Sequence, residues 1–193
     1  MRKIILSIPI TLDGYIEGSH RELDWVTADD EMHDYFTEVL RSVDMMIFGR
    51  VAYELLASYW PTAPSDPNIT RGMLDFANTI NPLPKIVYSR TLEKVGWNTR
   101  ILKSFVPEEI RQLKVQSGGN IALSGGASIA QQFIQHGLVD EFQLVIQPAV
   151  IGKGKSLFGG ITNGLKMELV WEKTLRSGTV ALCYRPDGMI RGT

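Results

Sequence analysis

The order of apolar and polar residues predicts strands that alternate with helices over the first two thirds of the chain. Short apolar runs bounded by turn residues indicate buried strands at 2–9, 45–48, 85–88 and 120–123. A further short extended piece surrounds Ile101. Apolar residues at helical spacing predict helices from near Thr27, at about 51–58, at about 71–79, from Pro107, and up to His136-Gly137.

Two of these helices carry start signals. Thr27-Ala28-Asp29-Asp30 has the form of a capping box, with Thr27 as the capping residue. Pro107 followed by Glu108 and Glu109 fits a first helical turn, because proline has no amide to leave unpaired there and acidic groups face the positive end of the helix dipole.

The last third of the chain has a different pattern. Residues 142–147 alternate between apolar and polar, and two strands at 166–175 and 178–184 are joined tightly at Ser177-Gly178. The sequence therefore predicts one α/β domain over residues 1–193, with a mixed sheet that is mostly parallel and ends in antiparallel strands. Apolar side chains in these C-terminal strands also predict a homodimer.

Composition narrows the class of protein. The 20 basic and 21 acidic side chains give a net charge of −1 without a basic stripe, so nucleic acid is not an expected partner. No apolar run approaches the ~20 residues of a membrane span. Cys183 is the single cysteine, which favours a reducing, cytoplasmic location. The three histidines have no ligand spacing, so no metal is expected.

Three predicted strands end in groups that suit anions, at the sheet edge where α/β proteins bind ligands. Ser124-Gly125-Gly126-Ala127-Ser128 leads into a helix whose free amides suit a pyrophosphate, although it also reads as a tight turn. Gly49-Arg50 offers a guanidinium for phosphate oxygens, unless Arg50 pairs with Glu54. Ser89-Arg90 is a third such end, or an ordinary loop.

An ordered set of motifs resembles the dihydrofolate reductase-like superfamily, and more closely the RibD C-terminal (riboflavin-biosynthesis reductase) domain in its stand-alone form. The set consists of Thr11–Ile16, Phe48–Glu54, Val87–Leu92, Ser124–Ala127, Val139–Glu141, Pro148–Gly154 and Leu157-Phe158. The resemblance implies a three-layer α/β/α fold, a homodimer, and an NADPH-dependent reductase. Its substrate would be a small heterocyclic molecule, such as 5-amino-6-(5-phosphoribosylamino)uracil or a folate. A nucleotide-binding or regulatory module without turnover is the alternative.

The same resemblance implies where the cofactor binds. Gly49 and Arg50 would meet its phosphates, Ser89 and Arg90 would bracket the ribose 2′-phosphate, and Gly125, Gly126, Ala127 and Ser128 would hold the pyrophosphate. The loop with Thr11, Gly14 and Tyr15 would close over the nicotinamide. The family often has threonine two residues after the arginine, where this chain has Ala52.

The catalytic candidates are Asp13 and Asp30. Dihydrofolate reductases place a carboxylic acid on the first helix, where this chain offers Asp30, Glu31 and Asp34. Asp30 also fits a structural role in the capping box, and Asp13 fits a turn position before Gly14.

Overall fold

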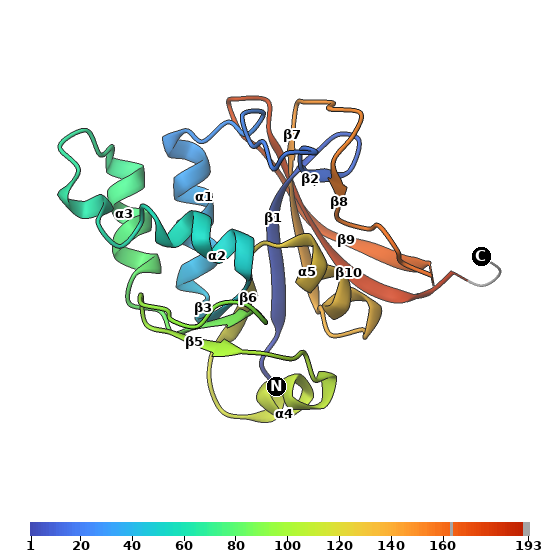
Figure 1. Ribbon diagram of the computed structural model, residues 1–193. Coiled ribbons are helices and arrows are strands. Elements are labelled where there is room, and N and C mark those ends of the chain that lie inside the picture. The colour runs from blue at the N-terminus through green and yellow to red at the C-terminus, as the bar shows by residue number, and fades with distance from the viewer. Residues whose placement is uncertain (163, 191–193) are drawn as a thin grey trace.

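The computed structural model describes residues 1–162 and 164–190, and an eight-stranded sheet runs through its centre (Figure 1). Its strands lie in the order β5-β4-β3-β6-β1-β7-β10-β9. Their bounds are β1 (Ile4–Thr11), β3 (Val43–Gly49), β4 (Lys85–Tyr88), β5 (Thr99–Leu102), β6 (Asn120–Leu123), β7 (Glu141–Gln147), β9 (Leu165–Thr174) and β10 (Val180–Met189). The strands from β5 to β7 pair in parallel, and β10 is antiparallel to both β7 and β9. The predicted mixed α/β sheet is confirmed.

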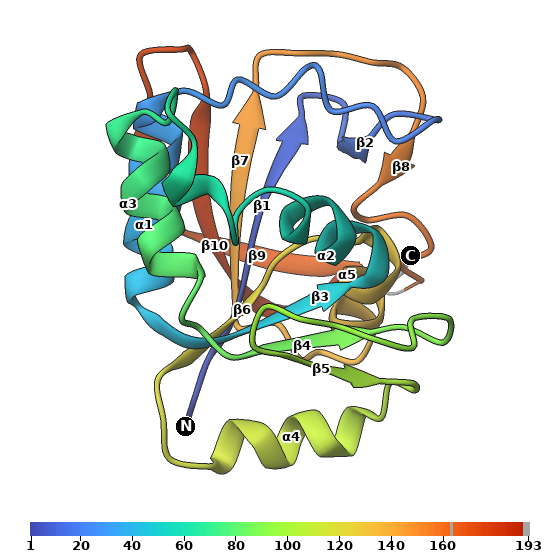
Figure 2. The same ribbon diagram turned by 60° about the vertical axis from the view of Figure 1, so that its left-hand side comes forward.

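Helices cover both faces of the sheet, because alternate strand residues point to opposite sides. The helices are α1 (Asp30–Arg41), α2 (Arg50–Ala57), α3 (Arg71–Ile80), α4 (Pro107–Val115) and α5 (Ala127–Gln135). Ile5 of β1 packs in one core cluster with residues of α1, α2 and α3, whereas its neighbours Ile4 and Leu6 pack in a second cluster with α4 and α5. In Figure 2, α1 and α3 lie side by side on the first of these faces.

A small second sheet consists of β2 (Tyr15–Glu17) and β8 (Lys155–Ser156). Tyr15 pairs with Ser156, so the segment after β1 lies against the segment after β7. Strands of three and two residues are too short to show a periodicity, and the sequence did not predict them. This pairing holds the segment that follows β1 in place beyond the carboxyl end of that strand.

The first helix begins later than the capping-box pattern predicts. Asp29, not Thr27, is the capping residue, and its carboxylate accepts a hydrogen bond from the amide of Met32 at 2.8 Å. The amide of Thr27 instead donates to the side chain of Gln147 at 3.0 Å, which ties this residue to the end of β7 before the helix starts. The capping box at Thr27 was therefore wrong, whereas the predicted start of α4 at Pro107 is confirmed.

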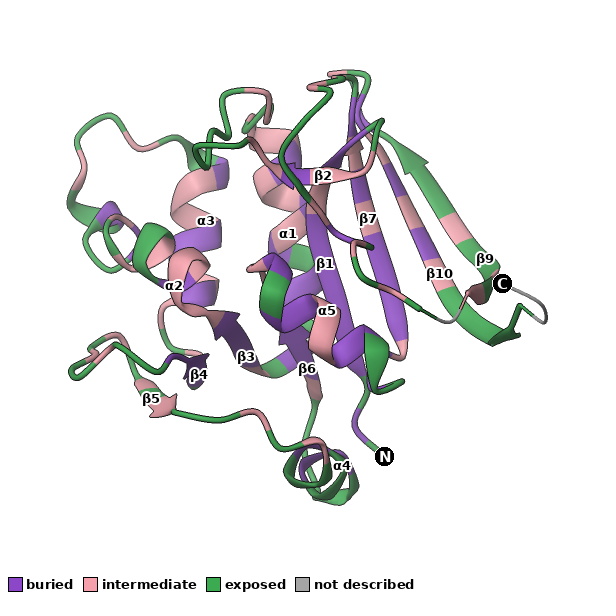
Figure 3. Cartoon of the chain, turned by 45° about the vertical axis from the view of Figure 1, so that its right-hand side comes forward, coloured by how far each residue is buried: buried purple, intermediate pink, exposed green. Residues whose placement is uncertain are grey.

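The end of the sheet formed by β10 and β9 is its most exposed part. β9 is the edge strand at this end, and Figure 3 shows exposed residues along much of β9 and along the C-terminal half of β10.

Cys183 lies in the buried part of β10, where burial raises the pKa of its thiol to about 11. The thiol is therefore protonated at neutral pH. In the described part of the chain, every helix is too short or too polar to span a membrane.

Candidate active site

A polar cleft of about 680 Å³ lies at the carboxyl ends of four neighbouring strands. Residues directly after β3, β4 and β5 line it, together with Gly126 and the start of α5, which follow β6. The carboxyl ends of parallel strands meet at one sheet edge, which is where open α/β sheets bind ligands. The cleft therefore has the position expected of a ligand site.

The cleft has a strong excess of positive charge. Five cationic side chains and one carboxylate line it: Arg21, Arg50, Arg90, Lys103, Lys155 and Glu17. Arg50 pairs with Glu54 at 2.7 Å, and Lys155 pairs with Glu17 at 3.3 Å. Arg90 is exposed and forms no ion pair with any described residue. This balance suits a ligand with several negative charges.

Backbone groups at the start of α5 add to this preference. Gly126 precedes the helix without a side-chain cap. The amide of Ile129 donates to the carbonyl of Gly126 at 3.2 Å, whereas the amides of Ala127 and Ser128 have no partner among the described residues and are available to a ligand. Ala127 and Ser128, in that first turn, line the cleft. The amide of Gly49 donates to the carbonyl of Gly125 at 3.3 Å and joins the two glycine turns.

The loop after β4 is fixed by Ser89. The side chain of Ser89 is buried, and its Oγ accepts hydrogen bonds from the amides of Thr91 at 3.2 Å and Leu92 at 2.9 Å. Those bonds hold Arg90 at the turn that lines the cleft. Ser89 is therefore a positioning residue for the adjacent guanidinium as well as a lining residue.

A second cavity of about 760 Å³ adjoins the cleft and is largely apolar. Its wall is formed by side chains from β1, α1, α2, α3 and the loop before η1 (Ala63–Ser65), among them Met32, Phe36, Leu55, Leu56, Trp60 and Phe76. We call it the apolar pocket. It sits on the sheet face that α1 and α3 cover.

The cleft and the apolar pocket share a wall. Glu17, Arg21, Val51 and Gly126 line both cavities. The two cavities therefore adjoin one another, with these four residues at their common boundary.

His33 projects from α1 into the aromatic part of the pocket wall. Its ring packs edge-on against Trp60 at 5.7 Å and Phe76 at 5.9 Å between centroids. Its Nδ1 is buried and has no hydrogen-bond partner among the described residues. Burial lowers the pKa of His33, so the ring is neutral at neutral pH.

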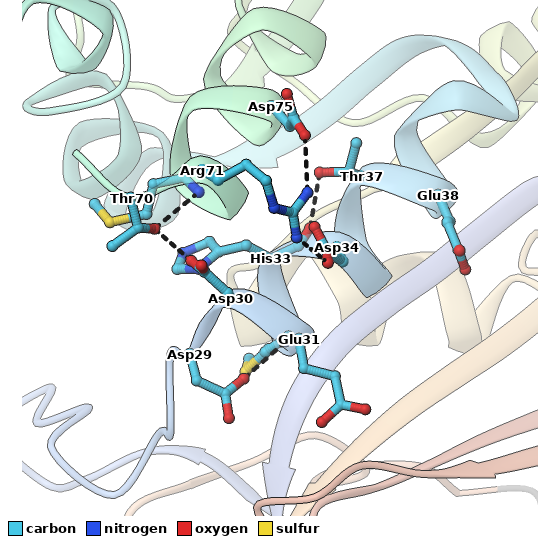
Figure 4. A network of polar contacts seen from close by, with 12 residues as sticks. Asp29, Asp30, Glu31, His33, Asp34, Thr37, Glu38, Thr70, Arg71 and Asp75 are labelled. Atoms are coloured by element: carbon cyan, nitrogen blue, oxygen red, sulfur yellow. Dashed lines mark hydrogen bonds and ion pairs between the residues drawn. The ribbon is translucent and has the colours of Figure 1, made fainter.

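The acids of α1 point away from both cavities. Figure 4 shows Asp30 accepting a hydrogen bond from the hydroxyl of Thr70, and Asp34 paired with Arg71 at 2.7 Å. Glu31 accepts from the amide of Arg176 at 2.8 Å. None of the three carboxylates lines the cleft or the apolar pocket. A catalytic role for Asp30 stays a prediction, and its contacts are those of a residue that joins α1 to α3.

Asp13 has a structural set of contacts as well. Its exposed carboxylate accepts hydrogen bonds from the amides of Ile151 at 3.2 Å and Gly152 at 2.7 Å. A hydrogen bond with the Thr11 side chain, followed by these amides, lowers the pKa of Asp13, so the group is ionised at neutral pH. An ionised carboxylate cannot donate a proton. The catalytic role of Asp13 is likewise untested.

The loop of Thr11, Gly14 and Tyr15 does not line either cavity. Thr11 is buried, and its hydroxyl accepts from the amide of Tyr15 at 2.9 Å. Gly14 has φ +84°, a backbone region that favours glycine. The loop turns back at Gly14 so that Tyr15 can pair with β8.

Most of the other residues predicted to bind the cofactor are brought together. Those that line the cleft are Gly49, Arg50, Ser89, Arg90, Gly126, Ala127 and Ser128. Gly125 lines the apolar pocket instead. The sequence reasoning missed Lys103 and Ser104, which also line the cleft. Both directly follow β5, so the same strand-end rule would have found them.

No group of three or more His, Cys, Asp or Glu side chains among the described residues could hold a metal ion. The candidate site consists of two adjoining cavities, one cationic and one apolar. The mixed sheet of this topology, flanked by helices, is the dihydrofolate reductase-like α/β fold. The chain belongs to the RibD C-terminal domain family, whose model matches residues 2–181.

Comparison with known proteins agrees with this assignment. The uncharacterized protein YyaP of Bacillus subtilis (strain 168) is 36% identical over 187 residues, which cover 97% of this chain and 96% of that protein. The diaminohydroxyphosphoribosylaminopyrimidine deaminase/5-amino-6-(5-phosphoribosylamino)uracil reductase of Thermotoga maritima shares the fold with a TM-score of 0.65 and 18% identity, over 96% of this chain and 56% of that one. Dihydrofolate reductase from Enterococcus faecalis, complexed with NADP(H), has a TM-score of 0.64 and 13% identity, over 96% and 97% of the two chains.

Proposed function

We propose that this protein is a cytoplasmic NADPH-dependent reductase of a small heterocyclic substrate. One observation carries the proposal: a cleft lined by five cationic side chains adjoins an apolar pocket, and four residues line both. A dinucleotide needs the first environment for its phosphates, and a ring substrate needs the second. Hydride transfer requires the two rings to meet, and the residues common to both cavities mark where that contact would form.

The cleft residues fit a nicotinamide dinucleotide phosphate. Arg90 and Ser89 would take the ribose 2′-phosphate, and Arg50 would take phosphate oxygens beside Gly49. The first turn of α5 would bind the pyrophosphate through its amides. The bound cofactor would supply the hydride, while the protein orients both molecules and excludes water between them.

A nucleotide-binding module without turnover is the second candidate. The observation in its favour is that no carboxylate of α1 lines either cavity. NADPH would then bind without being oxidised in the presence of ring substrates. Turnover with any such substrate would contradict this candidate.

Binding of NADPH tests the cofactor assignment directly. A ligand at 100 times its dissociation constant stabilises a folded protein by about 2.7 kcal/mol, so the melting temperature should rise with NADPH concentration. Calorimetric titration would give the dissociation constant, which we expect to be micromolar, or about −8 kcal/mol. The variant Arg100→Ala is a suitable control, because Arg100 is exposed on β5 and lines neither cavity. No thermal shift at millimolar NADPH would rule out the assignment.

A further inference from the structure

We infer that the apolar pocket selects an uncharged, largely apolar ring compound that carries no phosphate. This inference deepens the proposed function, and rests on it for the role of the pocket as the substrate site. The resemblance implied either a phosphoribosyl compound, 5-amino-6-(5-phosphoribosylamino)uracil, or a folate, and both of these substrates are anionic. The pocket of this chain is built for a different chemical class.

The interior of the pocket is apolar on several sides. Phe36 and Met32 of α1 face it together with Trp60 and Phe76, and the helix α2 adds Leu56. Trp60 and Phe76 contact each other with centroids 4.5 Å apart. Flat aromatic compounds gain most from such walls, since edge-to-face contacts add to the burial of apolar area.

The charged groups at the pocket do not favour an anion. Among the described residues that line it, Glu17 and Asp24 carry carboxylates and Arg21 carries the single permanent positive charge. Arg21 and Glu17 also belong to the wall shared with the cleft, so they lie toward the cofactor side. The cleft has the opposite balance of charge, with five cationic side chains and one carboxylate. A phosphate is thus accommodated in the cleft and not in the pocket.

His33 adds no positive charge to the pocket. Its ring lies against Trp60 and Phe76, and burial keeps it neutral at neutral pH. Asp30 and Asp34, on the same helix, are held by Thr70 and Arg71 and do not line the pocket. A phosphate or carboxylate brought inside would lose its hydration without gaining a cationic partner.

A matched pair of fluorescent dyes tests this selectivity without measuring turnover. N-phenyl-1-naphthylamine is uncharged, and 8-anilinonaphthalene-1-sulfonate has the same ring system with an added sulfonate. Both become fluorescent in apolar surroundings, so each can be titrated against the protein. We expect the uncharged dye to bind at least about tenfold more tightly, a difference of roughly 1.4 kcal/mol. Saturating NADP⁺ in a parallel titration keeps the sulfonate out of the cleft.

Two variants locate the dye. Leu55 lines the pocket but is 53% exposed, so Leu55→Asp places a carboxylate at the pocket with little risk to folding. Val115, 71% exposed at the end of α4, lines neither cavity, and Val115→Asp is the matched control. We expect Leu55→Asp to weaken the uncharged dye several-fold and Val115→Asp to leave it unchanged. Melting curves of both variants verify the fold.

Each outcome decides a separate question. Equal or tighter binding of the sulfonate in the presence of NADP⁺ overturns the inference, as does an equal effect of the two variants. Binding of the uncharged dye without any binding of NADPH would contradict the proposed reductase and leave the pocket selectivity intact. Binding of NADPH with no preference between the dyes would contradict the pocket selectivity and leave the proposed reductase intact.

Discussion

Gly126 and Gly49 lie so close that a Cβ on Gly126 would be 3.2 Å from the Cα of Gly49. Gly126 also has φ +91°, where side chains are disfavoured. The backbone at the end of β3 thus lies directly against the backbone that leads into α5. This close approach brings Arg50 and the first turn of α5 into one cleft.

Gly126→Ala should damage both stability and cofactor binding. The new methyl group would push β3 and α5 apart in addition to straining the backbone. Calorimetric titration should show NADPH affinity reduced by about tenfold or more, which is about 1.4 kcal/mol. Melting curves should show a lower midpoint as well.

Gly137→Ala separates the effect of backbone strain from the effect of the close contact between Gly126 and Gly49. Gly137 also has a positive φ, of +62°, but a Cβ there meets no atom within 4 Å. This substitution should cost only the backbone strain, about 1–2 kcal/mol, with unchanged NADPH affinity. Equal losses of affinity in the two variants would show that the contact with Gly49 is unimportant for the cleft.

Arg90→Ala should distinguish NADPH from NADH. The two cofactors differ by the 2′-phosphate, and a hydrogen bond to a charged group contributes about 1.5–3 kcal/mol. We therefore expect NADPH binding to weaken by roughly ten- to a hundredfold, NADH binding to change little, and the preference to shrink as salt is raised. Titration of both cofactors into this variant and into Arg100→Ala checks the expectation. Similar losses for both cofactors would assign Arg90 a structural role.

The sequence predicted the cleft far better than the pocket, for a physical reason. The cleft is made by residues next to strand ends, such as Arg50 and Ser128, and strands are visible in the apolar pattern. The pocket is made by side chains such as Phe36 and Trp60, which belong to separate elements and read as ordinary core residues. Only the packing of α1, α2, α3 and the segment after α2 on one face of the sheet brings them to one cavity.

The start of α1 shows the same limit of prediction from sequence, within a single helix. Thr27-Ala28-Asp29-Asp30 satisfies a local capping pattern, yet the amide of Thr27 bonds to Gln147, which is 120 residues away in sequence. A local pattern contains no information about such a partner. The short strands β2 and β8 were missed because their pairing also depends on distant segments.

Stability should fall more steeply with acid in the wild type than in His33→Leu. Burial lowers the pKa of His33 below its ordinary value of 6.5, so the unfolded chain binds more protons than the folded one as pH drops below that value. The free energy of unfolding therefore decreases with falling pH by this contribution. Denaturant titrations between pH 7 and about pH 5 would measure the slopes. The exposed His136 provides the control His136→Leu, and identical slopes in the wild type and His33→Leu would refute the expectation.

The protein should be a homodimer that forms through its C-terminal strands. β9 is one of the two edge strands of the eight-stranded sheet, and it exposes Leu169 and Val170, with exposed fractions of 46% and 37%. An exposed apolar edge is stabilised by pairing with another copy. Light scattering at micromolar protein should give twice the chain mass, and Leu169→Lys should halve it. A wild-type mass of one chain would count against the dimer.

The wall common to the cleft and the apolar pocket has a thermodynamic consequence. Because Glu17, Arg21, Val51 and Gly126 face both cavities, a molecule in one of them becomes part of the surface that a molecule in the other contacts. The affinity for either ligand then depends on whether the other is present. Linkage requires that factor to be the same in both directions. With the proposed cofactor in the cleft and the proposed substrate in the pocket, the two sites would form one coupled unit, in which each ligand changes the other's dissociation constant.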